Sequence, residues 1–167
     1  MGRAPGRVGC YDKALELLSA RPHFVSELEN KLRRRGYPRE EIDAALGRLE
    51  ELGHLNDRQT ARELVTSRLR RGGTGARRLF AELRRRGAPS EAAEQAVREL
   101  VPRDELPQAR LAAERWRRIG GRRPAGIDAL ARHLERRGFS ASVIRSLLRE
   151  LKAEPGADRR EDPDSVS

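Results

Sequence analysis

The chain has 167 residues, of which 37% are apolar, 37% are charged and only 4% are aromatic, so a core must be built from aliphatic side chains. One cysteine and three histidines exclude a disulfide framework and a cysteine-based zinc site. The sequence contains no apolar run of 18 residues and no apolar segment in residues 1–9, which argues against a membrane span and a signal peptide. We therefore expect a cytoplasmic protein.

The formal net charge of +10 is unevenly distributed. Residues 1–56 carry 10 basic and 9 acidic side chains, residues 57–102 carry 11 and 6, and residues 103–152 carry 13 and 6. The last segment, 153–167, reverses the sign with 2 basic and 5 acidic side chains. A basic excess favours nucleic acid, or an acidic protein surface, as the partner.

An internal repeat of 51 residues organises the chain. Gly36, Gly87 and Gly138 each follow a run of arginines, and both spacings between them are 51. The same shift superposes four sets of apolar residues: Leu28, Leu79 and Leu130; Leu32, Leu83 and Leu134; Leu46, Val97 and Leu148; Leu49, Leu100 and Leu151. This many gap-free matches indicate a true repeat.

The residues before each glycine predict a helix. Leu28 and Leu32 lie four positions apart and so share one helix face, and Gly36 ends that helix in the left-handed conformation. Ser26 and Glu29 have the spacing of a capping box, which predicts the start of the helix.

The residues after each glycine predict a second helix. Pro38, followed by two glutamates, suits a helix start, and Ile42, Leu46 and Leu49 form its apolar stripe. A further helix precedes each pair, at about 11–20, 57–71 and 105–119. No alternation typical of β-strands competes with this pattern.

The predicted fold is all-α, with three tandem three-helix repeats stacked into an elongated, curved array. Short helices of this kind are marginal alone and need their neighbours. The expected organisation is a flexible basic N-terminus, three repeats and a disordered acidic tail; the boundaries are 1–9, 10–56, 57–102, 103–152 and 153–167.

Arginines are the candidate binding residues. One hypothesis is a row of cationic patches that meets a repetitive anionic partner; the alternative is that arginines at helix ends only complement the helix dipole. A further basic group surrounds Trp116, which either stacks on a base or packs in the core; it consists of Arg115, Arg117, Arg118, Arg122 and Arg123. The candidates are Arg33, Arg34, Arg35, Arg84, Arg85, Arg86, Arg117, Arg118, Arg122, Arg123, Arg136 and Arg137.

No catalytic, metal or cofactor site is predicted. Residues 72–75, Gly-Gly-Thr-Gly, lack the Gly-Lys-Ser/Thr of a phosphate loop, and a flexible connector with Thr74 capping the next helix is favoured. The histidines occupy different positions in the repeat, and no nucleophile, base and acid are spaced as a catalytic set.

The chain resembles the RecX family, regulators of the bacterial RecA recombinase. Three stretches carry the resemblance: residues 26–36 of the first repeat; residues 49–57 with Ala61 following, which include Leu-Gly-x-Leu-Asn-Asp; and residues 75–87 of the second repeat. Leu130, Leu134, residues 137–139 and Ile144 continue it in the third repeat, so that it covers about residues 11–152. Asn56, where the family often has an acidic residue, and the small Ala88, Ala92 and Ala93 depart from the pattern.

This resemblance implies a non-enzymatic modulator that binds in the groove of the RecA–DNA filament and limits recombinase, ATPase and coprotease activities in DNA repair and the SOS response. It also implies moderate, non-specific binding to single- and double-stranded DNA, and we expect a monomer. Two alternatives stay open: a helix-turn-helix-like transcriptional regulator, and a helical scaffold for an acidic protein.

Overall fold

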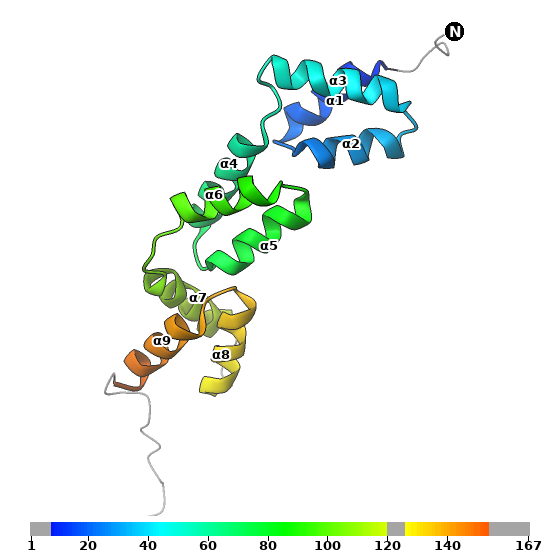
Figure 1. Ribbon diagram of the computed structural model, residues 1–167. Coiled ribbons are helices and arrows are strands. Elements are labelled where there is room, and N and C mark those ends of the chain that lie inside the picture. The colour runs from blue at the N-terminus through cyan, green and yellow to red at the C-terminus, as the bar shows by residue number, and fades with distance from the viewer. Residues whose placement is uncertain (1–7, 120–125, 154–167) are drawn as a thin grey trace, which may run out of the picture. The chain divides into compact units, whose positions relative to one another are not determined.

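The computed structural model describes residues 8–119 and 126–153, which are helical apart from short connections (Figure 1). The all-α prediction is confirmed. The helices in this part of the chain are α1 (Cys10–Ala20), α2 (Val25–Arg34), α3 (Arg39–Glu51), α4 (Asp57–Arg71), α5 (Ala76–Arg86), α6 (Ser90–Leu100), α7 (Leu106–Ile119), α8 (Ile127–Arg136) and α9 (Ala141–Ala153). None of these helices is long and apolar enough to span a membrane.

The helix starts reproduce the 51-residue repeat. Helices α2, α5 and α8 begin at residues 25, 76 and 127, and α3, α6 and α9 begin at 39, 90 and 141. The helices predicted at 11–20, 57–71 and 105–119 agree with α1, α4 and α7 to within one residue. Gly36, Gly87 and Gly138 have φ of 77°, 100° and 86°, as predicted for residues that end a helix in the left-handed region.

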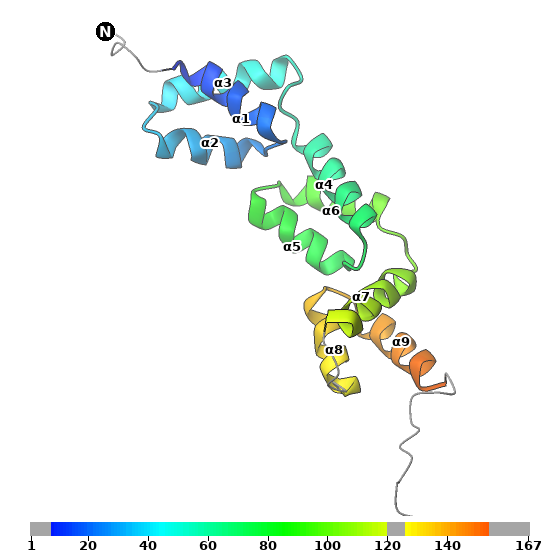
Figure 2. The same cartoon turned by 180° about the vertical axis from the view of Figure 1, so that it is seen from behind.

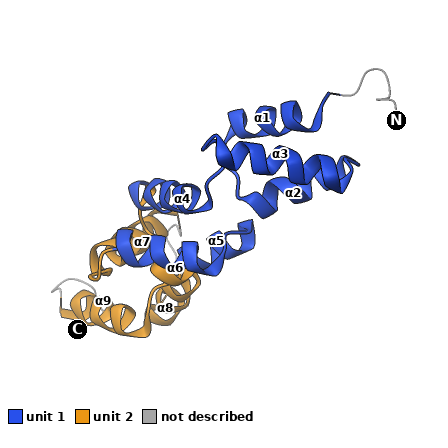
Figure 3. Ribbon diagram, turned by 45° about the horizontal axis from the view of Figure 1, so that its top comes forward, with its two compact units in different colours: residues 1–70, 79–101 blue, residues 71–78, 102–167 orange. Residues whose placement is uncertain are grey.

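The chain forms two compact units (Figure 3). The first comprises residues 1–70 and 79–101, and the second comprises residues 71–78 and 102–167. The boundary places the end of α4 and the first turn of α5 in the second unit. The predicted flexible N-terminus and the acidic tail fall almost entirely outside the described residues.

The first unit contains two aliphatic cores. One is formed by α1, α2 and α3 around Leu28, Leu32 and Leu49. The other is formed by α4, α5 and α6 and includes small residues such as Ala93; Figure 2 shows these three helices from behind. Phe24, from the connection before α2, is fully buried in this second core. Two of the small alanines that depart from the family pattern, Ala88 and Ala93, therefore share a core with an aromatic ring from the preceding repeat.

The second unit has one aliphatic core formed by α7, α8 and α9. Leu134 and Leu147 are buried there, together with Phe139 from the turn between α8 and α9. Trp116 is half-buried against this core, and its ring centroid lies 6.0 Å from that of His133. Of the two roles considered for Trp116, the structure shows packing.

The predicted capping box at the start of α2 is wrong. The helix begins one residue before Ser26, and no side chain of its own N-cap residue bonds to it. The amide of Val25 instead donates to Asp57 Oδ1 at 2.8 Å, and Ser26 Oγ donates to the carbonyl of Gly87 at 2.9 Å. The cap thus comes from the start of α4, and the capping box fails because Ser26 lies inside the helix, after its N-cap residue Phe24.

The prediction of a flexible connector at residues 72–75 is also wrong. All four residues are buried in the second unit. Thr74 does not cap α5, because the amide of Ala76 donates to Glu105 Oε1 at 2.6 Å. Gly73 donates its amide to Gln108 Oε1 at 2.8 Å. The segment is held by side chains at the start of α7.

Candidate anion-binding surface

The repeat generates two equivalent contacts. In the first unit, the turn between α5 and α6 meets the first turn of α2, and we call this the first contact. In the second unit, the turn between α8 and α9 meets the first turn of α5, and we call this the second contact. Ser26 Oγ donates to Gly87 O in the first, and Gly75 donates its amide to Arg137 O at 2.9 Å in the second.

One arginine plays the same part in both contacts. Arg86 Nη2 donates to the carbonyl of Pro22 at 3.1 Å, and Arg137 Nε donates to the carbonyl of Gly73 at 2.6 Å. Both donors and both acceptors are 51 positions apart in the sequence. Two of the predicted binding residues therefore bond to the backbone of the preceding repeat.

The first contact pairs its cations with a carboxylate. Glu27 accepts a hydrogen bond from Arg21, and its Oε2 lies 3.5 Å from Arg86 Nη2. Burial raises the pKa of Glu27, but the hydrogen bond and charge of Arg21, with the charges of His23 and Arg86, bring it below its ordinary value. The first contact is thus a structural junction in which one carboxylate pairs with the neighbouring cations.

A buried histidine adds to the first contact. His23 is 2% exposed, its Nδ1 lies 2.8 Å from the carbonyl of Arg21, and its Nε2 lies 2.7 Å from Lys31 Nζ. The two distances fit a neutral ring that donates from Nδ1 and accepts from Lys31 at Nε2. Burial lowers the pKa of His23, and the charges of Arg21 and Lys31 act in the same direction.

The second contact places a cation where the first has the carboxylate. Arg78 is the equivalent of Glu27, 51 residues later, and its Nη1 donates to the carbonyl of Arg136 at 3.0 Å. Arg115 Nη1 donates to the carbonyl of Gly72 at 3.1 Å. Burial lowers the pKa of Arg137, and the charges of Arg78 and Arg115 lower it further. The guanidinium groups therefore lie close enough to repel one another.

These residues form a candidate anion-binding surface, which we call the arginine cluster. Within residues 8–119 and 126–153, none of its members has a carboxylate partner at ion-pair distance. Backbone carbonyls orient three of its guanidinium groups, so that they are positioned without being neutralised. The members are Arg78, Arg115 and Arg137, which these bonds position, and the exposed Arg77 and Arg136, which adjoin Arg78 and Arg137 in the sequence.

The other predicted arginines are placed differently. In the first repeat, Arg33 pairs with Glu29 at 3.5 Å, Arg34 is exposed, and Arg35 donates to the carbonyl of Lys31 at 3.0 Å. The run 33–35 ends α2, whereas the run 84–86 lies beside the start of that helix. A ten-residue helix separates them by about 15 Å.

In the second and third repeats, Arg84 donates to the carbonyl of Ala88 and Arg85 is exposed. Arg117 is exposed, and Arg118 pairs with Glu114 at 3.7 Å. Arg122 and Arg123 lie outside the described residues. Of the predicted candidates, the structure brings together only Arg136 and Arg137.

The cluster contains three residues that the candidate set omitted, Arg77, Arg78 and Arg115. Arg77 and Arg78 open a helix, where arginine opposes the dipole, so a search for basic helix ends passes over them. The signal that finds Arg78 is the charge reversal from Glu27 at equivalent positions of the repeat.

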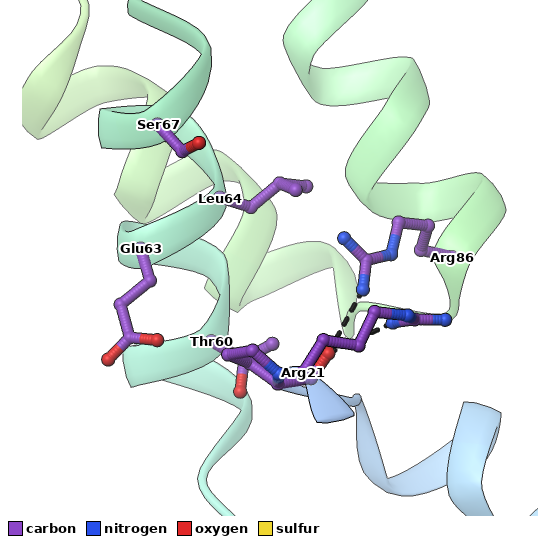
Figure 4. Close-up of a pocket in the computed structure, with 7 residues that line it drawn as sticks. Arg21, Thr60, Glu63, Leu64, Ser67 and Arg86 are labelled. Atoms are coloured by element: carbon purple, nitrogen blue, oxygen red, sulfur yellow. Dashed lines mark hydrogen bonds between the residues drawn. The ribbon is translucent and has the colours of Figure 1, made fainter. Parts of the chain in front are cut away.

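A pocket of about 280 Å³ lies in the first unit beside Leu64, Ser67 and Thr60 (Figure 4). Arg21 and Arg86 lie on one side of it, and both donate to the carbonyl of Pro22. Its volume is at the lower end of small-molecule sites, and its two cations are already bound to Glu27. The described residues include no group of three or more His, Cys, Asp or Glu that could hold a metal.

Comparisons with known proteins agree on one family. Residues 10–49 match the model of the RecX first three-helix domain, and residues 56–97 match that of the RecX second three-helix domain. Regulatory protein RecX of Trichlorobacter lovleyi is 38% identical over 83% of this chain and 92% of its own length. That of Prosthecochloris aestuarii is 36% identical over 84% of this chain and 91% of its own length.

Solved structures agree with the fold. The crystal structure of RecX from Lactobacillus salivarius superposes with a TM-score of 0.72 at 23% identity, covering 86% of this chain and 94% of that one. A crystal structure of regulatory protein RecX gives a TM-score of 0.70 at 21% identity, covering 83% and 69%. With relatives this similar over most of its length, the chain belongs to the RecX family.

Proposed function

We propose that this chain is a regulator that binds the RecA–DNA filament and restrains its recombinase, ATPase and coprotease activities, with no catalysis of its own. The arginine cluster is the observation that supports this proposal best. The name regulatory protein RecX, carried by relatives of similar length, supports the same role. A DNA-repair partner of this kind places the protein in the cytoplasm.

The chemistry of the cluster favours phosphates as the contacted groups. Arginine presents planar donors that fit phosphate oxygens, and each phosphate contact releases counterions, so binding weakens as salt rises. Backbone contacts of this kind carry no sequence information. We therefore propose moderate, non-specific binding to single- and double-stranded DNA. The exposed Arg34, Arg85 and Arg117 are secondary candidates for the same polymer.

The test is a charge reversal in the cluster. The variant carries Arg77→Glu, Arg78→Glu and Arg136→Glu, which are all exposed; Arg137 is left in place because it is half-buried and bonds to the backbone of Gly73. The measurement is ATP hydrolysis by RecA on single-stranded DNA as this protein is titrated. We expect the wild type to lower the rate, and the variant to need at least about tenfold more protein for the same inhibition.

A matched control carries the same change of charge in the same unit. Arg145, Arg149 and Lys152 are exposed on α9, and replacing all three with Glu leaves the cluster intact. We expect this control to inhibit like the wild type. Absence of inhibition by the wild type would refute the function, whereas equal loss in both variants would refute the cluster as the site.

Direct DNA binding is measured separately, by fluorescence anisotropy with labelled single-stranded DNA at several salt concentrations. The slope of log affinity against log salt is expected to fall by about one for each arginine that contacts a phosphate. A slope that is the same in the wild type and the triple variant would contradict a phosphate contact by the cluster.

A further inference from the structure

The contact that joins repeats has two complementary halves. One half is a turn with a left-handed glycine, and the other is the first turn of the second helix in the preceding repeat. Gly87 packs against Ser26 in the first contact, and Gly138 packs against Arg78 in the second. The chain thus builds the same contact twice. It also contains one more turn with a left-handed glycine and one more helix start at the equivalent positions of the repeat.

The first of these copies is the turn at Gly36, between α2 and α3. Gly36 is exposed, whereas Gly87 is half-buried and Gly138 is buried at the equivalent positions. All three glycines share the left-handed conformation. The turn at Gly36 therefore has the shape that packs against a helix start elsewhere in the chain, and it is accessible.

The second copy is the first turn of α8, which begins at Gly126 and Ile127. Ile127 is 43% exposed, whereas its equivalents Val25 and Ala76 are half-buried. No side chain caps this helix start. The starts of α2 and α5 are each covered by a turn of the next repeat. At the start of α8 the apolar side chain of Ile127 is instead accessible.

Gly126 is the N-cap residue of α8, a position where glycine is common, and it leaves space beside the helix start. Its equivalent Gly75 is needed for a close approach, because a Cβ there would lie 2.5 Å from the carbonyl oxygen of Gly138. Gly126 has an ordinary φ of −58°, and a Cβ would meet nothing within 4 Å. The space beside Gly126 therefore admits a backbone as close as that of Gly138 is to Gly75.

We propose that the turn at Gly36 of one copy docks on the first turn of α8 of a second copy, giving head-to-tail association. A second copy is the occupant because the turn that fits a helix start is a part of this chain. Turns of this kind already pack on helix starts in the first and second contacts. The interface joins two different surfaces, so it is heterologous. A turn against a helix end is small, and the expected Kd is on the order of 0.1–1 mM, so the chain is monomeric when dilute.

Sedimentation velocity of the purified chain over a range of concentrations tests this proposal without DNA or recombinase, so its outcome is independent of the proposed function. Gly126→Leu fills the docking surface and is expected to weaken association at least about tenfold. Gly47→Leu is the matched control, since a Cβ at Gly47 in α3 also meets nothing within 4 Å. A monomeric wild type at all concentrations, or equal effects of the two variants, would overturn the proposal.

A gain-of-function variant provides a second measurement. Ala129 on α8 is equivalent to Glu27, which pairs with Arg86, and Arg35 is equivalent to Arg86. Ala129→Glu is therefore expected to tighten association about threefold, by an exposed ion pair between copies. Adding Arg35→Glu should remove that gain. Unchanged association in Ala129→Glu would contradict the head-to-tail geometry.

Discussion

The first and second contacts use the same backbone arrangement with opposite side-chain chemistry. Glu27 in the first is replaced by Arg78 in the second, so that the cations of one contact share a carboxylate and those of the other repel one another. The bond from arginine to a carbonyl is common to both. A repeat can therefore keep its packing fixed while one position decides whether the junction is structural or available to an anionic partner.

The two contacts also differ in how they fill space. Phe24 in the first inserts a ring into the core of α4, α5 and α6, whereas its equivalent Gly75 lets two backbones meet directly. A side chain can shift when its neighbour grows, but two backbones in contact cannot. The second contact should therefore tolerate substitution less well than the first.

Replacing each of the three turn glycines with alanine is expected to lower the free energy of unfolding by different amounts. At Gly138 the new Cβ meets the backbone of Arg78, and we expect a loss of about 3 kcal/mol or more in the free energy of unfolding. At Gly87 it meets the hydroxyl of Ser26, which can move, so the loss is smaller. At Gly36 the left-handed strain costs about 1–2 kcal/mol.

Urea unfolding followed by circular dichroism measures all three variants. The order of the losses is the informative result, with Gly138 first, Gly87 second and Gly36 third. Equal losses at Gly138 and Gly87 would contradict the distinction between a backbone and a side-chain neighbour.

Exchanging the charge at the equivalent positions tests the electrostatic difference. Glu27→Gln leaves Arg21 and Arg86 without their carboxylate, and we expect it to lower the free energy of unfolding by about 1–2 kcal/mol. Arg78→Glu gives the second contact the carboxylate of the first, and we expect a gain of up to about 1 kcal/mol. If thermal melting shows both changes to be destabilising, the second contact does not carry unbalanced positive charge.

The smallest expected effect is a pH dependence of the first contact. Because the folded-state pKa of His23 is lowered, the unfolded chain takes up the proton first as the pH falls through about 6.5, so stability declines from there until the folded pKa is reached. The decline amounts to about 1.4 kcal/mol for each unit by which the pKa is lowered. Glu27 acts at lower pH, because its stabilisation is lost only as the pH falls below 4.5 toward its lowered pKa.

His23→Gln keeps a polar group beside Lys31 and removes the titration. Denaturant midpoints between pH 5 and pH 7 should then depend less on pH than in the wild type. The remaining dependence is assigned to His133, whose pKa is lowered by burial and by the charges of Arg137 and Arg136. An unchanged dependence in His23→Gln would show that this residue does not titrate in the contact.

The helices could be predicted from the sequence because their signals are local. Leu28, Leu32 and Gly36 determine one helix and its end within nine residues, and the shift by 51 transfers that result to α5 and α8. The caps could not be predicted, since Asp57 reaches Val25 across 32 positions and competes with the nearby Ser26. Local spacing does not contain that information.

The candidate site was only partly predictable for a related reason. Arg136 and Arg137 could be found as a basic helix end, but Arg78 and Arg115 join them only through contacts of the fold. The same contacts show that Arg86, equivalent to Arg137, bonds within a junction that contains a carboxylate. A run of arginines predicts a helix end, whereas its charge balance depends on residues about 60 positions away.

The half-buried indole of Trp116 has a practical consequence. It is the sole tryptophan of the chain and lies in α7 of the second unit, while both tyrosines, Tyr11 and Tyr37, lie in the first. Tryptophan emission therefore reports on the surroundings of α7 and α8, whereas the circular dichroism signal averages over all helices. One sample observed by both methods can show whether the repeats unfold together or in sequence.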